Sequence, residues 1–167
     1  AGDGTVGQLA RAGIALPRVE AVFLSHLHPD HTAGLNAVLA LRNQTTVKDR
    51  LTVYGPPGTQ ALVAGIVASM QPAAAAGYGV PGQSWAPPAD GVTVVELVGG
   101  ADVTIGTMRL RTVQNSHYDF APGSAEDKAY KSLSFRFDLP ARSIVYTGDT
   151  GPSPAVERFA AGADLLV

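Results

Sequence analysis

Residues 25–31 read Ser25-His26-Leu27-His28-Pro29-Asp30-His31 and directly follow the apolar run 22–24. The chain has only four histidines, and this stretch contains three of them together with a carboxylate. In an extended segment, residues i and i+2 project to the same side, so His26 and His28 can reach one metal ion together. Pro29 favours an extended residue before it and can open a helix after it. We therefore predict a metal site at a strand-to-helix turn, with Asp30 and His31 on the turn.

The donor types in this stretch limit which metal is expected. Neutral imidazole and carboxylate suit zinc, manganese or iron. The chain has no cysteine, which argues against copper(I) and iron–sulfur clusters and removes disulfides and thiol nucleophiles. Taken alone, Asp30 would be a helix cap and His26 a hydrogen-bonded residue at a strand end, so it is the cluster that favours a metal. We expect zinc, with iron and manganese left open.

The His-x-His-x-Asp-His string after a strand resembles the motif of hydrolases of the metallo-β-lactamase superfamily. Such hydrolases place a further histidine after a later strand, and here His117 follows the alternating segment 108–113. They also use an aspartate that bridges two metals, commonly in a Gly-Asp-Thr turn after a strand. Here Asp149 stands in the segment Thr147-Gly148-Asp149-Thr150, which follows the apolar residues 144–146.

The resemblance implies a role for each of these residues. The expected ligands of a first metal are His26, His28 and His117. The expected ligands of a second metal are Asp30 and His31, with Asp149 bridging the pair. Two bridged ions would supply a hydroxide nucleophile, and Asp30 would act as the catalytic residue that takes the proton and returns it to the leaving group.

The resemblance also implies the fold, an α/β protein with the four-layer α/β/β/α metallo-β-lactamase sandwich. We expect residues 1–167 to form a single domain of this kind, truncated at both ends. The first five residues look like the turn after an opening strand, and the last second-metal histidine of the family is expected beyond Val167. We expect residues 60–90 to form an insert that overhangs the site.

Hydrophobic periodicity and turn residues predict the order of elements. We expect helices over 5–15, 32–42 and 58–70. We expect strands over 19–25, 51–54, 92–98, 103–105, 108–113, 132–137 and 143–146, and a last strand near the end of the chain. The Ala/Gly/Pro-rich residues 73–88 are predicted to be a loop. Residues 123–131 are predicted to be a hairpin loop with solvated charges, in which Lys128 or Lys131 could hold a substrate anion.

Several functions fit these observations. We predict a dinuclear zinc hydrolase for a phosphoester, sulfate ester or related small ester, in the phosphodiesterase, tRNA 3′-processing and arylsulfatase-like branch. The alternative enzymes are a lactonase and a glyoxalase II-type thioesterase. The alternative that is not an enzyme is a noncatalytic metal-binding domain. Asp149 at the bridging position disfavours β-lactam cleavage, and His28 disfavours the oxygen-reductase branch.

Charge and hydropathy limit the partners that we expect. The chain has a net charge of −2 and no dense Lys/Arg run, which argues against long nucleic acid as the default partner. No apolar stretch reaches transmembrane length, so we expect no membrane partner and a cytoplasmic location. A small-molecule ester is the expected substrate, and a homodimer is left open.

Overall fold

The computed structural model describes residues 1–167, which form helices and strands, and the strands belong to two sheets. This arrangement confirms the predicted α/β class. The chain divides into two units. The first unit contains residues 1–24, 28–54 and 59–95, and the second contains residues 25–27, 55–58 and 96–167.

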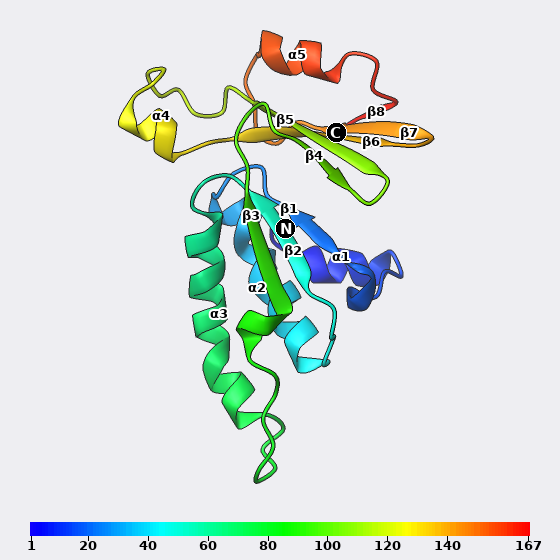
Figure 1. Ribbon diagram of the computed structural model, residues 1–167, viewed down its shortest axis with the longest axis vertical. Helices are drawn as coiled ribbons and strands as arrows, with labels where there is room; N and C mark the ends of the chain where they lie inside the picture. Colours follow the sequence, from blue (N-terminus) through cyan, green and yellow to red (C-terminus); the bar gives the residue numbers. More distant parts are fainter. The chain divides into compact units, whose positions relative to one another are not determined.

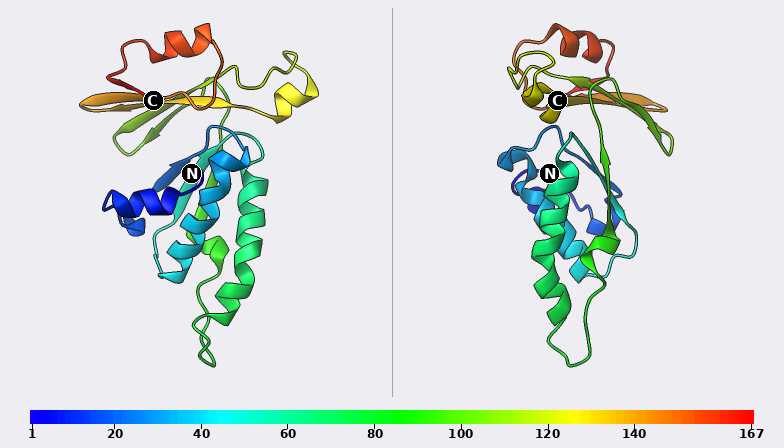
Figure 2. Two further views of the ribbon diagram at one scale, coloured as in Figure 1. Left: turned by 180° about the vertical axis from the view of Figure 1, so that it is seen from behind. Right: turned by 60° about the vertical axis from the view of Figure 1, so that its left-hand side comes forward.

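The first unit is built on a three-stranded sheet in the order β1-β2-β3. Its strands are β1 (Ala21–Phe23), β2 (Leu51–Gly55) and β3 (Val92–Glu96), and β1 runs parallel to β2 with Val22 opposite Val53. The helices α2 (Pro29–Gln44) and α3 (Thr59–Ala76) run along one face of this sheet (Figure 1, Figure 2). The shorter helices of this unit are α1 (Thr5–Arg11), η1 (Leu16–Arg18) and η2 (Pro88–Gly91).

Helix α2 is held in place by apolar contacts and by one buried arginine. Its fully buried Leu35 and Val38 lie three residues apart, which is the spacing of one helical face. Arg42 is only 4% exposed, and its guanidinium donates hydrogen bonds to the backbone oxygens of Leu16 (2.5 Å), Val19 (2.9 Å) and Asp49 (2.8 Å). Burial lowers the pKa of Arg42 from its usual value. The three carbonyls compensate for the removal of this cation from water.

The second unit contains a five-stranded sheet in the order β4-β5-β6-β7-β8. Its strands are β4 (Asp102–Ile105), β5 (Met108–Gln114), β6 (Leu133–Leu139), β7 (Arg142–Tyr146) and β8 (Leu165–Leu166). Neighbouring strands are antiparallel from β4 to β7, whereas β8 runs parallel to β7. Helix α5 (Pro154–Ala160) lies over one face of this sheet, and the short helix α4 (Ala125–Ala129) interrupts the connection from β5 to β6 (Figure 2).

Several element boundaries differ from the sequence prediction; helix α1, for example, ends at Arg11 instead of residue 15. Three of the differences have a clear local reason. Helix α2 begins at Pro29 instead of residue 32, because proline is preorganised for the first helical position. Helix α3 continues past Pro72 to Ala76, where a run of alanines has the highest helix propensity. The predicted loop 123–131 contains α4, whose first turn is capped by the Ser124 side chain accepting from the Asp127 backbone N–H at 3.1 Å.

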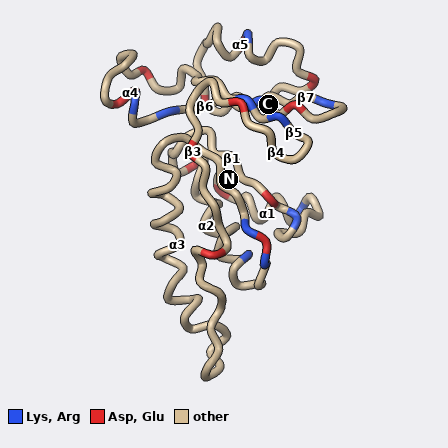
Figure 3. The backbone as a smooth tube through the Cα atoms, in the orientation of Figure 1, with Lys and Arg blue, Asp and Glu red and all other residues tan.

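Charged residues are distributed unevenly along the helices. Helix α3 has no Lys, Arg, Asp or Glu over its whole length, whereas the second sheet has charges of both signs, such as Asp102 in β4 and Arg109 in β5 (Figure 3). Despite its uncharged sequence, α3 is not long and apolar enough to cross a membrane, and neither is any other helix.

Candidate metal centre

The histidine string begins where β1 ends. The Leu24 backbone N–H donates to Tyr54 O at 2.8 Å, and after this last contact with β2 the chain leaves the sheet. His26 is fully buried, and its Nδ1 lies 3.2 Å from the Ser25 hydroxyl oxygen. A hydrogen bond to one ring nitrogen fixes the orientation of an imidazole and directs the other nitrogen toward a ligand.

The rest of the string forms the start of α2. His28 is the N-cap residue, and Asp30 and His31 lie in the first turn. The carboxylate of Asp30 is 74% exposed and lies 3.4 Å from His31 Nε2. An acidic residue in the first turn also favours the helix, because the N-terminus has a partial positive charge.

Three segments of the second unit are joined by hydrogen bonds around His26. The Leu133 backbone N–H donates to Ser25 O at 2.8 Å. The buried Asn115 donates from Nδ2 to Thr147 O at 3.0 Å and accepts from the His117 backbone N–H at 3.2 Å. Asn115 thus connects the loop of His117 with the turn that contains Asp149, and this connection limits how far the two loops can separate.

The glycine of the Gly-Asp-Thr turn is required by this packing. Gly148 has a φ of +61°, and a Cβ at this position would lie 2.8 Å from Ser25 Cβ and 3.3 Å from Leu133 O. Only glycine combines a left-handed backbone with so close an approach to a neighbouring segment. The turn can therefore lie directly against the residue that precedes His26.

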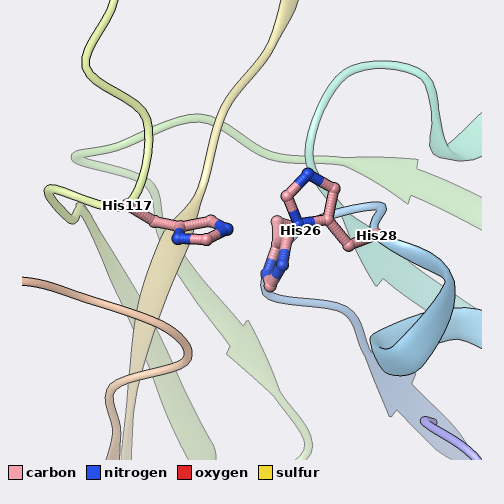
Figure 4. Close-up of side chains that lie close together, drawn as sticks. All are labelled: His26, His28 and His117. Atoms are coloured by element: carbon pink, nitrogen blue, oxygen red, sulfur yellow. The ribbon is translucent and has the colours of Figure 1, made fainter.

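The predicted ligands form two groups of three. The rings of His26 and His117 have centroids 4.5 Å apart and are inclined at 61°. One potential ligand atom from each residue lies within 4.8 Å of the others in both groups, which are His26 with His28 and His117, and His26 with His31 and Asp149. Figure 4 shows the three imidazoles of the first group near one another.

The donor set of these groups suits a metal such as zinc. Imidazole nitrogens make up the first group, and the second adds one carboxylate oxygen. All four histidines of the chain belong to one group or the other. Asp30 is the one predicted ligand that belongs to neither group. Its assignment as a ligand and as the catalytic residue stays a prediction, as does the binding of metal by the other five residues.

Some residues that shape this region were missed in the sequence. Asn115 and Ser25 are common polar residues with no spacing signal, and only the fold brings their side chains to the candidate ligands. Tyr118 was missed too: its ring centroid lies 5.0 Å from that of His117 and 6.0 Å from that of His26, and burial raises the pKa of its phenol. The only sequence signal for Tyr118 is its position directly after the candidate ligand His117.

The two lysines predicted to hold an anion have different environments. Lys131 Nζ lies 2.9 Å from Asp127 Oδ1, with the two side chains only 13% and 19% exposed. This pair corrects the prediction that the charges of residues 123–131 are solvated. Lys128 is exposed and forms no ion pair, so it is the lysine of the two that is available to an anion.

Comparisons with known proteins identify the family of this chain. The family model of the beta-lactamase superfamily domain matches residues 1–167. The chain is 33% identical over 171 residues to a ribonuclease Z from Mycobacterium sp. (strain KMS), covering 99% of this chain and 55% of that protein. It is 26% identical over 201 residues to a ribonuclease Z from Ignicoccus hospitalis, covering 99% of this chain and 62% of that protein. The chain thus spans about half the length of the curated relatives it matches.

Solved structures show the same fold at lower sequence identity. The metallo-beta-lactamase fold protein YhfI from Bacillus subtilis superposes with a TM-score of 0.67 at 17% identity, over 99% of this chain and 55% of that one. The short form of human tRNase Z superposes with a TM-score of 0.64 at 20% identity, over 99% of this chain and 62% of that one. With a family match over its full length and this fold, the chain belongs to the metallo-β-lactamase superfamily.

Proposed function

We propose that this chain is part of a metal-dependent hydrolase of phosphodiesters. The observation that carries the proposal is the convergence of all four histidines and Asp149 into two overlapping groups of potential ligand atoms. A chance cluster of surface acids would be exposed and would lack imidazoles, whereas the one residue common to both groups, His26, is fully buried. The family relationship and the curated relatives named ribonuclease Z support the same class of chemistry.

In this proposal His26, His28 and His117 would hold a first zinc ion. Asp30 and His31 would contribute to holding a second, and Asp149 would be a ligand shared by both. Bound ions of this kind bring the pKa of a water ligand close to neutrality and polarise a phosphoryl oxygen. No serine or cysteine nucleophile is required for hydrolysis by such a site.

The chain's own residues orient the ligands and handle the proton. The Ser25 hydroxyl holds the ring of His26, and the Asn115 amide holds the loop of His117 against the strand end before Asp149. Asp30 has an exposed carboxylate beside His31, so it is open to solvent and to a substrate. We assign to Asp30 the acceptance of a proton from the attacking water and its return to the leaving group.

The substrate class follows from the relatives and from charge. The relatives at 33% and 26% identity are named ribonuclease Z, and the nucleotides of RNA are linked by phosphodiesters. A net charge of −2 disfavours a long contact with a polyanion, so we propose that this chain contacts only a short segment around the scissile bond. Sulfate esters, lactones and thioesters are the competing substrates.

Hydrolysis assays on the full natural chain test this proposal. We expect turnover of bis(p-nitrophenyl) phosphate and little of p-nitrophenyl sulfate or an aliphatic lactone. Replacing the proposed bridging ligand, Asp149→Ala, should reduce phosphodiester hydrolysis to background. The matched control Asp90→Ala removes an exposed carboxylate that belongs to neither group, and its activity should be unchanged.

The alternatives predict different results. Full activity of the Asp149→Ala variant would contradict the bridging role. Preference for the lactone or the sulfate ester would replace the phosphodiester assignment with one of the competing substrates. Stable metal binding without turnover of any of these esters would favour the noncatalytic metal-binding domain.

A further inference from the structure

A series of aromatic rings extends from the candidate metal centre along the segment between β5 and β6. We call residues 115–131 the aromatic loop. Ring centroids are 5.0 Å apart for His117 and Tyr118, 5.5 Å for Tyr118 and Phe120, and 6.1 Å for Phe120 and Tyr130. The planes of successive rings are inclined at 32°, 45° and 42°. These separations are typical of interacting aromatic pairs, so the four rings form one continuous cluster.

The outer rings of the series are exposed to solvent. Phe120 is 37% exposed and Tyr130 is 58% exposed, whereas Tyr118, nearer to His117, is partly buried. Scattered single apolar residues on a surface need no explanation, but adjoining exposed aromatics are typical of a binding surface. The exposed end of this series therefore offers aromatic surface to a ligand.

The aromatic loop is fixed at its base by a hydrogen-bond network around Asp127. The Asp127 carboxylate accepts from Lys131 Nζ at 2.9 Å, from the Gly123 backbone N–H at 2.9 Å and from Gln114 Nε2 at 3.1 Å. Gln114 is the last residue of β5, and Lys131 lies two residues before β6. The network thus joins the two ends of the loop, which lowers the conformational cost of presenting the rings to a ligand.

Charge in the aromatic loop favours recognition through the rings. The loop contains two lysines and three carboxylates, and one pair of these neutralises itself through the Lys131–Asp127 contact. The remaining Lys128 is outnumbered by Asp119 and Glu126, all three of which are exposed. A surface with this balance does not attract a phosphate backbone strongly. Stacking on a π-face is the contact that the loop can offer, and nucleobases supply such faces whatever their sequence.

We propose that Phe120 and Tyr130 form a stacking platform for a nucleobase next to the scissile phosphodiester. The proposal rests on the proposed function, and it names the part of the substrate that this chain recognises. Tyr118 links the platform to His117 and keeps the stacked base within reach of the metal ligands. The platform sets a preference for nucleotide substrates over phosphodiesters that lack an aromatic base.

Binding of two simple probes to the full natural chain tests the platform without requiring turnover. Adenosine 5′-monophosphate and ribose 5-phosphate share a sugar and a phosphate, so the ratio of their dissociation constants isolates the contribution of the base. We expect the wild-type protein to bind the nucleotide at least about tenfold more tightly, equivalent to about 1.4 kcal/mol. Isothermal titration calorimetry gives both constants.

Two alanine variants and two controls locate this contribution. Phe120→Ala and Tyr130→Ala should each reduce the ratio several-fold and leave the affinity for ribose 5-phosphate unchanged. Tyr130→Phe retains the ring and should retain the ratio. Tyr78→Ala removes an equally exposed tyrosine, 62% exposed, from the first unit and should also leave the ratio unchanged.

The outcomes separate the platform from the proposed function. The platform is overturned if the ratio of dissociation constants is unchanged in both alanine variants. It is also overturned if the wild-type protein binds the nucleotide and ribose 5-phosphate equally well. A change of oligomeric state in these variants with no change in the ratio also overturns it, because the rings would then form a contact between protein chains. A base contribution that depends on both rings, in a protein that hydrolyses no phosphodiester, would support the platform and overturn the proposed hydrolysis.

Discussion

Replacing Gly148 by alanine should damage the candidate metal centre through a single methyl group. Gly148 has a φ of +61°, a backbone region in which an L-residue costs about 1 kcal/mol. The added Cβ would also lie 2.8 Å from Ser25 Cβ, an atom next to the backbone that cannot move without moving the chain. Overpacking of this kind costs about 1–3 kcal/mol, so we expect a total loss of about 2–4 kcal/mol in the free energy of unfolding.

The same methyl group should also weaken metal binding. The Ser25 hydroxyl lies 3.2 Å from His26 Nδ1, and Asp149 directly follows Gly148. Displacing Ser25 from the turn therefore shifts a candidate ligand on each side of the contact. Loss of such orienting contacts typically lowers metal affinity by about 10–100-fold.

A second glycine supplies the control. Gly106 has a φ of +59°, but a Cβ there would meet no heavy atom within 4 Å. Gly106→Ala should therefore cost only about 1 kcal/mol and leave metal affinity unchanged. Urea unfolding and competition with a chelator measure the two quantities. If Gly148→Ala and Gly106→Ala behave alike in both assays, the packing of the turn against Ser25 does not shape the site.

Two further predictions concern stability. Arg42→Met removes the guanidinium from three backbone oxygens and should lower the free energy of unfolding by about 3–5 kcal/mol, whereas the exposed Arg11→Met should change it by less than about 0.5 kcal/mol. Urea unfolding measures both free energies. A loss below about 1 kcal/mol for Arg42→Met would contradict the role of the buried Arg42 in holding helix α2 in place. The hydrogen bond from Lys131 holds the pKa of Asp127 well below its usual value, so the carboxylate stabilises the fold above about pH 4 and loses this contribution as the pH falls further. The stability difference between the wild type and Asp127→Asn should therefore shrink below about pH 4, and a difference independent of pH would refute this reasoning.

The sequence predicted most elements of the fold because their signals are local. The alternating residues 108–113 correspond to β5 and the apolar residues 144–146 to β7, and the apolar run before the histidine string overlaps β1. The misjudged boundaries arose where one local signal competed with another. The Ala/Gly/Pro-rich composition after residue 70 predicted a loop, but the alanines after Pro72 continue the helix to Ala76. The charges of residues 123–131 predicted a solvated loop. Instead, the Ser124 cap and the Asp127–Lys131 pair stabilise a helical turn.

The candidate site was predictable to the extent that its motifs are contiguous or resemble known ones. His26, His28 and His31 stand in one string, and His117 and Asp149 were found because each follows a strand in the expected order. Their convergence depends on contacts between distant segments, such as Asn115 with Thr147 and Gly148 with Ser25, which leave no pattern in the sequence. The aromatic loop was missed for the same reason, because Phe120 and Tyr130 are ten residues apart and meet only through the fold.

Elemental analysis of metal bound to the purified full natural chain tests the central claim most directly. His26 is a proposed ligand of the first ion and is fully buried, so its replacement should remove that ion. We predict about two zinc ions per wild-type chain and at most about one in a folded His26→Ala variant. A wild-type protein free of metal, or a His26→Ala variant that retains the wild-type metal content, would contradict the account.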